Sequence, residues 1–151
     1  MNLKFRLATK EDLTEIVSML LDDVLGSKRE KISDEIPQSY FDAFEKIAKD
    51  PNQELTIVEL DGEKVATFQL SFIQYLTYQG GMRAQIEAVR THSNHRGKGI
   101  GKLVFEHAIN RAKEKGCHML QLTTDKQRPD AIRFYESLGF VASHEGMKLK
   151  F

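Results

Sequence analysis

Apolar side chains recur along the chain with the spacing of strands or of helices, and the first third of the chain contains one strand and two helices by this pattern. Residues 3–7 alternate between apolar and charged side chains, which predicts a short strand. Thr9 then caps a helix, with Asp12 in a near capping box, and this helix is expected to end near Gly26. The predicted buried stripe of this helix is Leu13, Ile16, Val17, Leu20 and Leu21. Residues 37–49 predict a second helix.

The middle of the chain predicts three strands. Residues 55–60 and the apolar run that begins at Val65 flank Asp61-Gly62, a dipeptide typical of a tight hairpin turn. Gly80-Gly81 then interrupts the pattern. Residues 83–91 follow as a central strand.

The last third of the chain alternates between helices and strands. A helix is predicted from Gly99 to Lys115, where Gly116 ends it, and a strand is predicted over residues 119–123. Pro129 suits the first turn of another helix, which Gly139 ends. Two final strands, residues 140–143 and 147–151, are predicted to form a hairpin. The complete order predicts an α/β (α+β) fold in which residues 1–151 form a single domain, with a mixed, mostly antiparallel twisted sheet and helices on both faces.

A glycine-rich turn joins the central strand to the helix that follows it. The sequence of this turn is Arg96-Gly97-Lys98-Gly99-Ile100-Gly101-Lys102. Glycines allow successive backbone N–H groups to converge, and the N-terminus of the helix adds partial positive charge. Because lysine and arginine side chains add further positive charge, the turn predicts a site for a phosphate or a pyrophosphate.

Several known phosphate-binding patterns can be compared with this turn. A Walker loop needs Ser or Thr after Gly101-Lys102, where this chain has Leu103. The dinucleotide pattern Gly-x-Gly-x-x-Gly fits Gly97 and Gly99 but finds Lys102 at its third glycine. A glycine-rich turn that binds no ligand is the simplest alternative. The pattern Arg/Gln-x-x-Gly-x-Gly is matched in full by Arg96, Gly99 and Gly101.

Composition excludes several classes of partner. The 22 basic residues balance the 22 acidic ones, so no overall electrostatic field recruits nucleic acid or an anionic membrane. The chain begins without the apolar segment of a signal peptide, and Cys117 is its single cysteine, so we expect a reducing, cytoplasmic location. Cys117 precedes an apolar strand and is interpreted as core packing rather than as a nucleophile. No spacing of Cys and His predicts a zinc site, and we expect no metal.

Two motifs together resemble the GNAT superfamily of N-acetyltransferases. The first is the Arg-x-x-Gly-x-Gly turn, and the second is Ala131-Ile132-Arg133-Phe134-Tyr135-Glu136-Ser137-Leu138-Gly139-Phe140, which is similar to the family pattern Ala-x-x-Phe-Tyr-x-x-x-Gly-Phe. The resemblance covers the whole chain and is weakest over residues 26–52. Residues 20–26 and 122–126 also resemble an uncharacterised bacterial subgroup of this superfamily, which names no substrate.

The resemblance implies acetyl-CoA as co-substrate, without a metal. Its pyrophosphate would bind the turn formed by Arg96, Gly97, Lys98, Gly99, Ile100, Gly101 and Lys102. Its pantetheine arm would add to the edge of the central strand along Val89, Arg90 and Thr91, where the family separates this strand from its neighbour at a bulge. The chain departs from the family at Arg128, where members often have an asparagine that touches the cofactor.

Transfer of an acetyl group to an amine needs a neutral amine, a donor to the oxyanion and a proton for the leaving thiolate. Glu87 lies on the central strand where family members often place a carboxylate, and Ile86 and Ala88 predict dry surroundings that would favour its protonated form. We expect Glu87 to accept the amine proton, directly or through water. A solvated carboxylate paired with an arginine such as Arg83 is the alternative. Tyr135 matches the tyrosine that protonates the departing sulfur, and a purely packed aromatic is its alternative.

The acceptor is expected to be a small primary amine. Asp22 and Asp23, at the end of the first helix, could bind a cationic acceptor, or could serve solubility alone. His92 and His95 are interpreted as solvent-facing loop residues. A protein amino group as the acceptor and a non-catalytic acyl-CoA sensor are the alternative functions. Many relatives dimerise, so a homodimer that uses the final hairpin is also an expectation from the resemblance.

Overall fold

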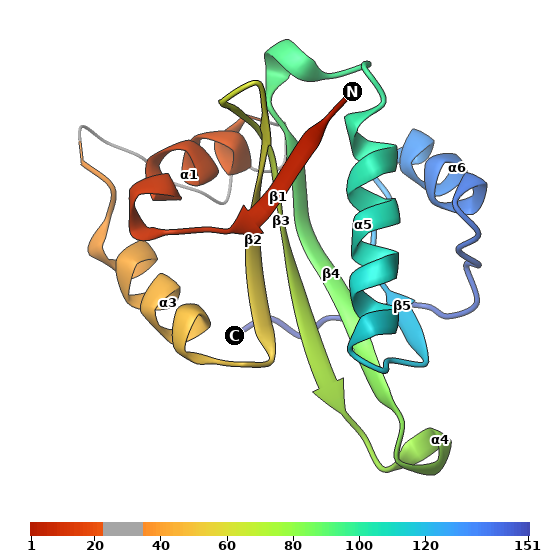
Figure 1. Cartoon of the computed structure of the whole chain (residues 1–151). Helices are drawn as coiled ribbons and strands as arrows, with labels where there is room; N and C mark the ends of the chain where they lie inside the picture. The colour runs from red at the N-terminus through yellow and green to blue at the C-terminus, as the bar shows by residue number, and fades with distance from the viewer. Residues whose placement is uncertain (23–34) are drawn as a thin grey trace.

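The computed structural model describes residues 1–22 and 35–151. Its centre is one five-stranded sheet with the strand order β1-β2-β3-β4-β5 (Figure 1). The strands are β1 (Leu3–Leu7), β2 (Gln53–Leu60), β3 (Glu63–Gln74), β4 (Met82–Thr91) and β5 (Met119–Gln121). The first four strands pair antiparallel in chain order, and β5 pairs parallel to β4. The mixed, mostly antiparallel sheet predicted from the sequence is therefore confirmed.

Helices lie on both sides of this sheet, as predicted. The helical elements are η1 (Lys10–Asp12), α1 (Leu13–Leu21), α3 (Gln38–Lys49), α4 (Thr77–Gly80), η2 (Ser93–His95), α5 (Ile100–Glu114) and α6 (Pro129–Ser137). Figure 1 shows α1 and α3 on one side of the strands and α5 and α6 on the other. None of the helices within these two described ranges has the length and apolarity that a membrane span requires.

Most of the core lies between α5 and the sheet. The α5 side chains that are buried there are Ile100, Val104, Phe105, Ala108 and Ala112. They pack against buried residues of β2, β3 and β4, among them Phe68, Leu70 and Ile86. A smaller cluster on the other face joins Ile16 and Met19 of α1 to Ile57 of β2. Because α5 is anchored along its whole length, its N-terminus is held firmly against the end of β4.

The predicted turn chemistry accounts for the β2–β3 hairpin. Asp61 and Gly62 have φ of 51° and 84°, so both lie in the left-handed region that a two-residue type I′ turn requires. Glycine adopts this conformation at no steric cost and aspartate tolerates it better than most residues. The hairpin therefore forms at the predicted position.

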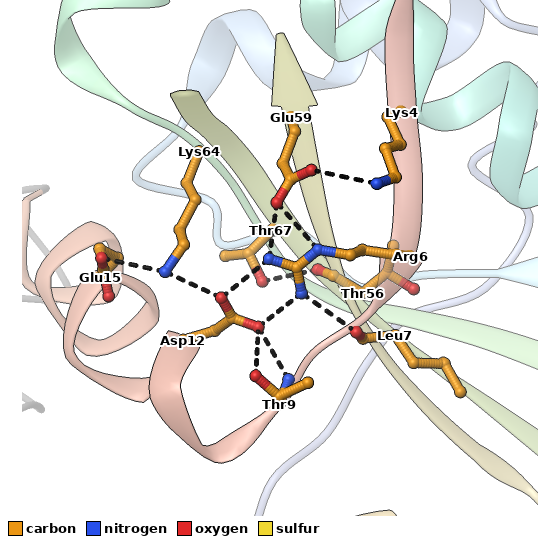
Figure 2. Close-up of polar contacts among 10 residues, drawn as sticks. All are labelled: Lys4, Arg6, Leu7, Thr9, Asp12, Glu15, Thr56, Glu59, Lys64 and Thr67. Carbon is orange, nitrogen blue, oxygen red and sulfur yellow. Dashed lines mark hydrogen bonds and ion pairs between the residues drawn. The ribbon is translucent and has the colours of Figure 1, made fainter. Parts of the chain in front are cut away.

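A network of ion pairs joins the first helical turn to three strands (Figure 2). Asp12 is only 2% exposed, and its carboxylate bonds the Arg6 guanidinium at 2.7 and 3.0 Å and the Lys64 ammonium at 2.8 Å. Arg6 also bonds Glu59 at 2.6 Å, and Lys64 also bonds Glu15 at 3.0 Å. The hydrogen bond from Arg6, supported by Lys64, holds the pKa of Asp12 well below its usual range. These contacts stabilise the position of α1 over β1, β2 and β3.

Asp12 also fulfils the capping role predicted for it. The backbone N–H of Thr9 donates to Asp12 Oδ2 at 2.7 Å, and the Thr9 hydroxyl lies 3.2 Å from the same oxygen. The carboxylate that caps the helical turn is thus the same one that binds Arg6 and Lys64.

The ends of two predicted elements were wrong. Helix α1 ends at Leu21 rather than near Gly26, which itself lies outside the described residues. A longer helix would include the two adjacent acidic residues that follow Leu21, and near a helix C-terminus their charges would oppose the helix dipole. Within α1, Met19 is buried while Leu20 and Leu21 are half-buried, so the buried stripe is rotated from the prediction. Strand β5 ends at Gln121 rather than at residue 123, because its pairing with β4 stops there.

The predicted final hairpin was also wrong. Residues 140–151 are all described, and no part of this segment lies in a strand. Its alternating pattern predicts a strand that buries one face, but in this structure the segment pairs with no strand of the described chain. A strand forms only where an edge is available to it, and alternation alone does not specify which edge that is.

Candidate functional site

Strand β4 loses its β5 neighbour halfway along. The two strands pair only at Arg83↔Met119, Ala84↔Leu120 and Gln85↔Gln121. Beyond Gln85, β4 stays paired with β3 alone, and the register between those two strands shifts opposite Phe68. Ala88 lies at this bulge with φ of 53°, a conformation that costs a non-glycine residue about 1–2 kcal/mol. Both the separation of the strands and the bulge agree with what the family resemblance implied.

The separation gives the second half of β4 an open edge. The N–H of His92 donates to the Val65 carbonyl of β3, so the alternation of an extended strand directs the N–H and C=O groups of Val89 and Thr91 to the opposite, open edge. The carbonyl of Val89 accepts from Arg90 Nη1 at 2.8 Å, and the carbonyl of Thr91 accepts from Arg96 Nε at 3.2 Å. The edge therefore offers N–H donors of fixed direction to an extended ligand.

The glycine turn follows this edge after the short helix η2 and leads into α5. Gly97 and Gly99 have φ of 75° and 81°, which explains why glycine stands at both positions. Ile100 begins α5 and is buried, so the helix N-terminus is fixed while the first-turn N–H groups of Ile100, Gly101 and Lys102 have no acceptor within the helix. Among the described residues, chain neighbours apart, no heavy atom lies within 4 Å of where a Cβ would stand on Gly97 or Gly99.

This turn fits a pyrophosphate. The uncrowded backbone lets an anion approach the N–H groups closely, and the dipole of the 15-residue helix adds partial positive charge. Lys98 and Lys102 are exposed beside the turn, and Lys102 lies 3.9 Å from Glu106 one helical turn away. A Cβ on Gly101 would make only ordinary van der Waals contact, 3.6 Å from the Phe134 ring of α6.

Arg96 and Asp22, which were predicted in different roles, meet in the structure. Arg96 Nη2 donates to the backbone oxygen of Asp22 at 2.6 Å and lies 3.4 Å from its carboxylate. Because Arg96 also bonds the Thr91 carbonyl, it ties the end of α1 to the glycine turn. A hollow of about 360 Å³ lies at this junction, lined by Ser18, Met19, Leu21, Asp22, His92 and Ser93. Asp23 lies outside the described residues.

Glu87 faces the α1 and α3 side of the sheet, because it pairs with Gln69, whose side chain is on that side. Its side chain is exposed, so the dry surroundings predicted from Ile86 and Ala88 were wrong. Successive strand residues point to opposite faces, and Ile86 therefore belongs to the α5 core rather than to the surroundings of Glu87.

Two glutamines hold Glu87 in place, an arrangement that the sequence alone did not indicate. Gln121 Nε2 donates to Gln85 Oε1 at 2.8 Å, and Gln85 Nε2 donates to Glu87 Oε1 at 2.7 Å. The chain of amides crosses from β5 to β4 at the last paired position of the two strands. The partner of Glu87 is thus Gln85, and Arg83 instead stacks on Tyr75 with 4.7 Å between guanidinium and ring.

An apolar cavity of about 110 Å³ lies on the same face of the sheet as Glu87. It is lined by Leu13, Ile16, Val17, Leu20, Tyr40, Ala43, Phe44, Ile47, Leu55, Thr67, Gln69 and Ala88. Its wall includes Ala88, the residue at the bulge, and Gln69, which lies opposite Glu87 on the neighbouring strand. Glu87 itself is not among these lining residues, so its carboxylate is a neighbour of the cavity rather than part of its wall.

Tyr135 is half-buried on α6, with its ring 5.5 Å from Phe105 and 6.1 Å from Phe140, centroid to centroid. Burial raises the pKa of the Tyr135 hydroxyl above its usual value, while the positive charges of Arg128 and Arg90 act in the opposite direction. The hydroxyl is therefore protonated throughout the neutral range. The hydroxyl also lies close enough to these two arginines for their positive charge to lower its pKa in part.

Two further residues received no contact role from the sequence, which marked Arg128 only as a departure from the family pattern and did not mention Thr124. Arg128 precedes α6 as its N-cap and acts electrostatically on Tyr135. The Thr124 hydroxyl, three residues beyond β5, is buried and has no hydrogen-bond partner among the described residues. A buried hydroxyl in this state marks a position where a ligand could bond. A threonine in a loop carries no sequence pattern that could have identified it.

The remaining candidates have local partners. His92 Nδ1 accepts from the Asn94 N–H at 3.2 Å, and His95 Nε2 lies 3.1 Å from a Glu63 carboxylate oxygen. Cys117 packs against the α5 core, and burial raises the pKa of its thiol, which disfavours a thiolate nucleophile. Cys117 packs on the α5 face of the sheet, whereas Glu87 lies on the face covered by α1 and α3.

Comparison with known proteins agrees with this geometry. The family model described as acetyltransferase (GNAT) family matches residues 18–140. Aminoalkylphosphonate N-acetyltransferase from Salmonella typhimurium is 28% identical over 93% of this chain and 86% of its own length. For three curated relatives matched over shorter stretches, the chain spans only 46% to 51% of their length.

Solved structures share the whole fold. A protein from Bacillus halodurans C-125 described as a transcriptional regulator is 57% identical, with a TM-score of 0.96, and the match covers 99% of this chain and 100% of that one. A predicted acetyltransferase from Clostridium acetobutylicum, solved with acetyl-CoA, is 25% identical, with a TM-score of 0.75 over 99% of this chain and 96% of that one. With both motifs, the open β4 edge and the family match over most of its length, this chain belongs to the acetyltransferase (GNAT) family.

Proposed function

We propose that this protein is an acetyl-CoA-dependent N-acetyltransferase in which a primary amine of a small molecule attacks the acetyl group directly. The observation that carries the proposal is the open edge of β4 beyond Gln85, which leads through η2 to the glycine turn at the start of α5. An extended ligand with a pyrophosphate at one end matches both parts. The single cysteine suits a reducing compartment, and we assign the reaction to the cytoplasm.

The co-substrate would be held by backbone more than by side chains. The N–H groups of Gly99, Ile100, Gly101 and Lys102 would bind the pyrophosphate, and Gly97 would keep the turn open. Lys98 would add positive charge. The pantetheine arm would pair with the edge formed by Val89, Arg90 and Thr91, opposite the buried Thr124 hydroxyl. Arg96 would contribute indirectly, because its contacts hold the turn against α1.

When bound, acetyl-CoA supplies an acetyl group activated as a thioester. A backbone N–H at Val89 would stabilise negative charge on the reacting carbonyl oxygen, since its direction is fixed by the β3 pairing. Tyr135, protonated at neutral pH, would give a proton to the departing sulfur. Because both groups belong to a regular strand or helix, little reorganisation would be needed for them to act.

Glu87 would remove the proton from the attacking amine. A free alkylamine has a pKa of about 10.4 and is almost entirely protonated at pH 7, so attack requires a base. An exposed carboxylate is accessible to the incoming ammonium and to water, and its bond with Gln85 orients it. The side chain would act directly or through one water molecule.

The acceptor would be a small amine with an apolar portion. The cavity of about 110 Å³ beside Glu87 has room for a few apolar atoms. Asp22 would attract the positive charge of the amine, together with Asp23, which lies outside the described residues. A relative named for an aminoalkylphosphonate substrate supports a small amine as the substrate class.

A non-catalytic acyl-CoA sensor is the second candidate. The similar structure described as a transcriptional regulator favours it. Such a module would need the glycine turn but neither the oriented Glu87 nor the buried Tyr135.

Thiol release from acetyl-CoA in the presence of a panel of primary amines separates the two functions. Release that depends on an amine and is lost in Tyr135→Phe supports the enzyme. Binding of acetyl-CoA in calorimetry without release for any amine would favour the sensor. Absence of binding would reject both.

A further inference from the structure

A row of uncharged polar side chains crosses the sheet on the face that carries Glu87. The pairing registers place four residues directly opposite one another on the adjacent strands β2 to β5, and these residues, called the polar row below, are Gln53, Ser71, Gln85 and Gln121. With neighbouring strands about 4.8 Å apart, the polar row spans roughly 14 Å. All of its side chains are partly exposed, so a ligand can reach them.

The polar row begins where the apolar cavity under α1 and α3 ends. Leu70 and Phe72 are buried in the α5 core on either side of Ser71, so the Ser71 side chain points to the opposite face of the sheet. On that face the cavity reaches Leu55 and Gln69, the next positions along β2 and β3, and no residue of the polar row lines it. The face therefore changes from apolar to polar at this point.

Hydrogen bonds within the polar row orient its side chains. Ser71 Oγ donates to Gln53 Oε1 at 2.8 Å, and Gln121 Nε2 donates to Gln85 Oε1 at 2.8 Å. Gln85 Nε2 in turn donates to Glu87 Oε1 at 2.7 Å, so the polar row is joined directly to the proposed base. A side-chain amide has two N–H donors and two acceptor lone pairs, so within the described ranges these bonds leave both kinds of group for a ligand.

Hydroxyl groups are the ligand chemistry that suits such a surface, because a hydroxyl both donates and accepts hydrogen bonds. The polar row contains no charged side chain, so it offers nothing to pair with a carboxylate or a phosphate. The charged group at its margin is the Glu87 carboxylate, where an ammonium would lie. A site that bonds hydroxyl groups disfavours an analogue without them, since its own polar groups are then left unpaired.

We propose that the polar row is an acceptor subsite for hydroxyl groups, and that the acceptor is an amine with several hydroxyl groups, of the amino-sugar or aminopolyol class. This inference rests on the proposed function, because the amine at Glu87 brings the rest of the ligand to the row. The hydroxyl groups would lie along the row, and the apolar portion of the acceptor would lie toward the cavity. Gln53 and Ser71 are separated from Glu87 by Gln85, so they would bind the ligand without taking part in proton transfer.

Matched pairs of amines test the proposal. Glucosamine is compared with cyclohexylamine, and serinol with isopropylamine, by thiol release from acetyl-CoA. The measured quantity is the ratio of kcat/KM for the hydroxylated amine to kcat/KM for its partner. Intrinsic differences between the two amines, including their pKa values, cancel when the ratio of a variant is divided by that of the parent.

Gln53→Leu and Ser71→Ala should each lower this ratio on the order of fivefold, because each removes one hydrogen-bonding partner of the ligand. Gln38→Leu is the matched control, since Gln38 is an exposed glutamine on α3 that bonds Asp42, and its ratio should equal that of the parent. If Gln53→Leu did not fold, the smaller change Ser71→Ala would still give the ratio.

The other outcomes separate this proposal from the proposed function. Unchanged ratios in both variants would overturn the subsite, while thiol release with cyclohexylamine would still support the enzyme. If no amine released thiol, the proposed function would fail, and titration of the protein with glucosamine in a calorimeter would decide the subsite alone. Absence of glucosamine binding, or equal binding by Gln53→Leu, would reject it. A loss seen only with the amine of trialanine would mean that the row binds a peptide backbone, which also rejects the assignment.

Discussion

At the scale of single residues, the proposed chemistry depends on two side chains in contrasting surroundings. Glu87 is exposed and held by an amide, whereas Tyr135 is half-buried and surrounded by aromatic rings. An accessible carboxylate suits exchange of a proton with an incoming amine. A buried hydroxyl with a raised pKa suits a donor that must stay protonated until the thiolate leaves.

Glu87→Gln should lower kcat/KM by about 10²-fold near pH 7, because glutamine keeps the shape but cannot accept a proton. The rate should recover at alkaline pH, where the amine loses its proton in solution. Rates from pH 6 to 10 check this, with Glu45→Gln, an exposed carboxylate on α3, as the control. A raised KM with an unchanged pH profile would mean that Glu87 only binds the ammonium. Unaltered kinetics would remove Glu87 from the mechanism.

Tyr135→Phe should lower kcat by up to about 10²-fold and leave the Kd for acetyl-CoA nearly unchanged, since only a proton donor is lost. Phenylalanine preserves the ring contacts with Phe105 and Phe140, so the thermal midpoint should change little. Single-turnover rates and calorimetric titration measure the two effects. Tyr75→Phe, on the exposed end of the β3–β4 hairpin, serves as the control. An unchanged kcat would assign Tyr135 to packing.

At the scale of elements, the proposed binding site depends on the junction of β4 with α5. Strand β4 supplies directed N–H groups because β5 stops pairing with it at Gln85. Helix α5 supplies free N–H groups because its N-terminus follows glycines rather than a capping side chain. Neither element would bind a phosphate ester alone.

Gly99→Asp should abolish binding of CoA, because its carboxylate would face the pyrophosphate without a partner charge. The variant also carries the strain of a non-glycine residue at φ of 81°. Gly116→Asp is a matched control, since Gly116 has the same φ at the opposite end of the same helix and, like Gly99, has no described residue beyond its chain neighbours within 4 Å of its Cβ position. Isothermal titration with CoA should show binding to the control only. Equal affinity in Gly99→Asp would place the cofactor elsewhere, and Gly101→Asp provides a second test of the same turn.

Local sequence patterns predicted most elements, because caps, turns and periodicity act within a few residues. The Asp61-Gly62 turn, the Thr9 and Asp12 cap and the Pro129 start of α6 were all correct. The errors arose where a distant partner decides the outcome. Residues 147–151 have the pattern of a strand but pair with no strand of the described residues, and the pairing of β5 with β4 stops at Gln121.

The same distinction applies to the site. The glycine turn and Tyr135 lie in contiguous motifs that a sequence displays directly. The surroundings of Glu87 could not be read from Ile86 and Ala88, because the side chains that contact a strand residue come from neighbouring strands. The Gln121 to Gln85 to Glu87 chain joins positions 36 residues apart and has no local signal.

At the scale of the whole molecule, the two sides of the sheet are stabilised differently. The α5 side is held by a continuous apolar core, whereas the first helical turn on the other side is held by the ion pairs of Asp12. Asp12 is the buried centre of this network, and its loss would leave Arg6 and Lys64, 28% and 24% exposed, with only Glu59 and Glu15 as partners. Global stability should therefore respond to Asp12 strongly and in a pH-dependent way.

Asp12→Asn should lower the free energy of unfolding by about 3 kcal/mol at pH 7, because Arg6 and Lys64 would keep their positions without the central charge. Asparagine can still accept from the Thr9 N–H, so the variant isolates the charge from the cap. The pKa of Asp12 is depressed in the folded protein, so its contribution is complete above the unfolded pKa of about 4 and is lost as pH falls toward the folded pKa. Urea unfolding from pH 7 to pH 2.5 should show the free energies of unfolding of the parent and of Asp12→Asn converging below pH 4.

The control is Glu15→Gln, at the exposed end of the same network, which should lower the free energy of unfolding by less than about 1 kcal/mol. A difference between parent and Asp12→Asn that stayed constant with pH would mean that the carboxylate stabilises by shape and capping rather than by charge.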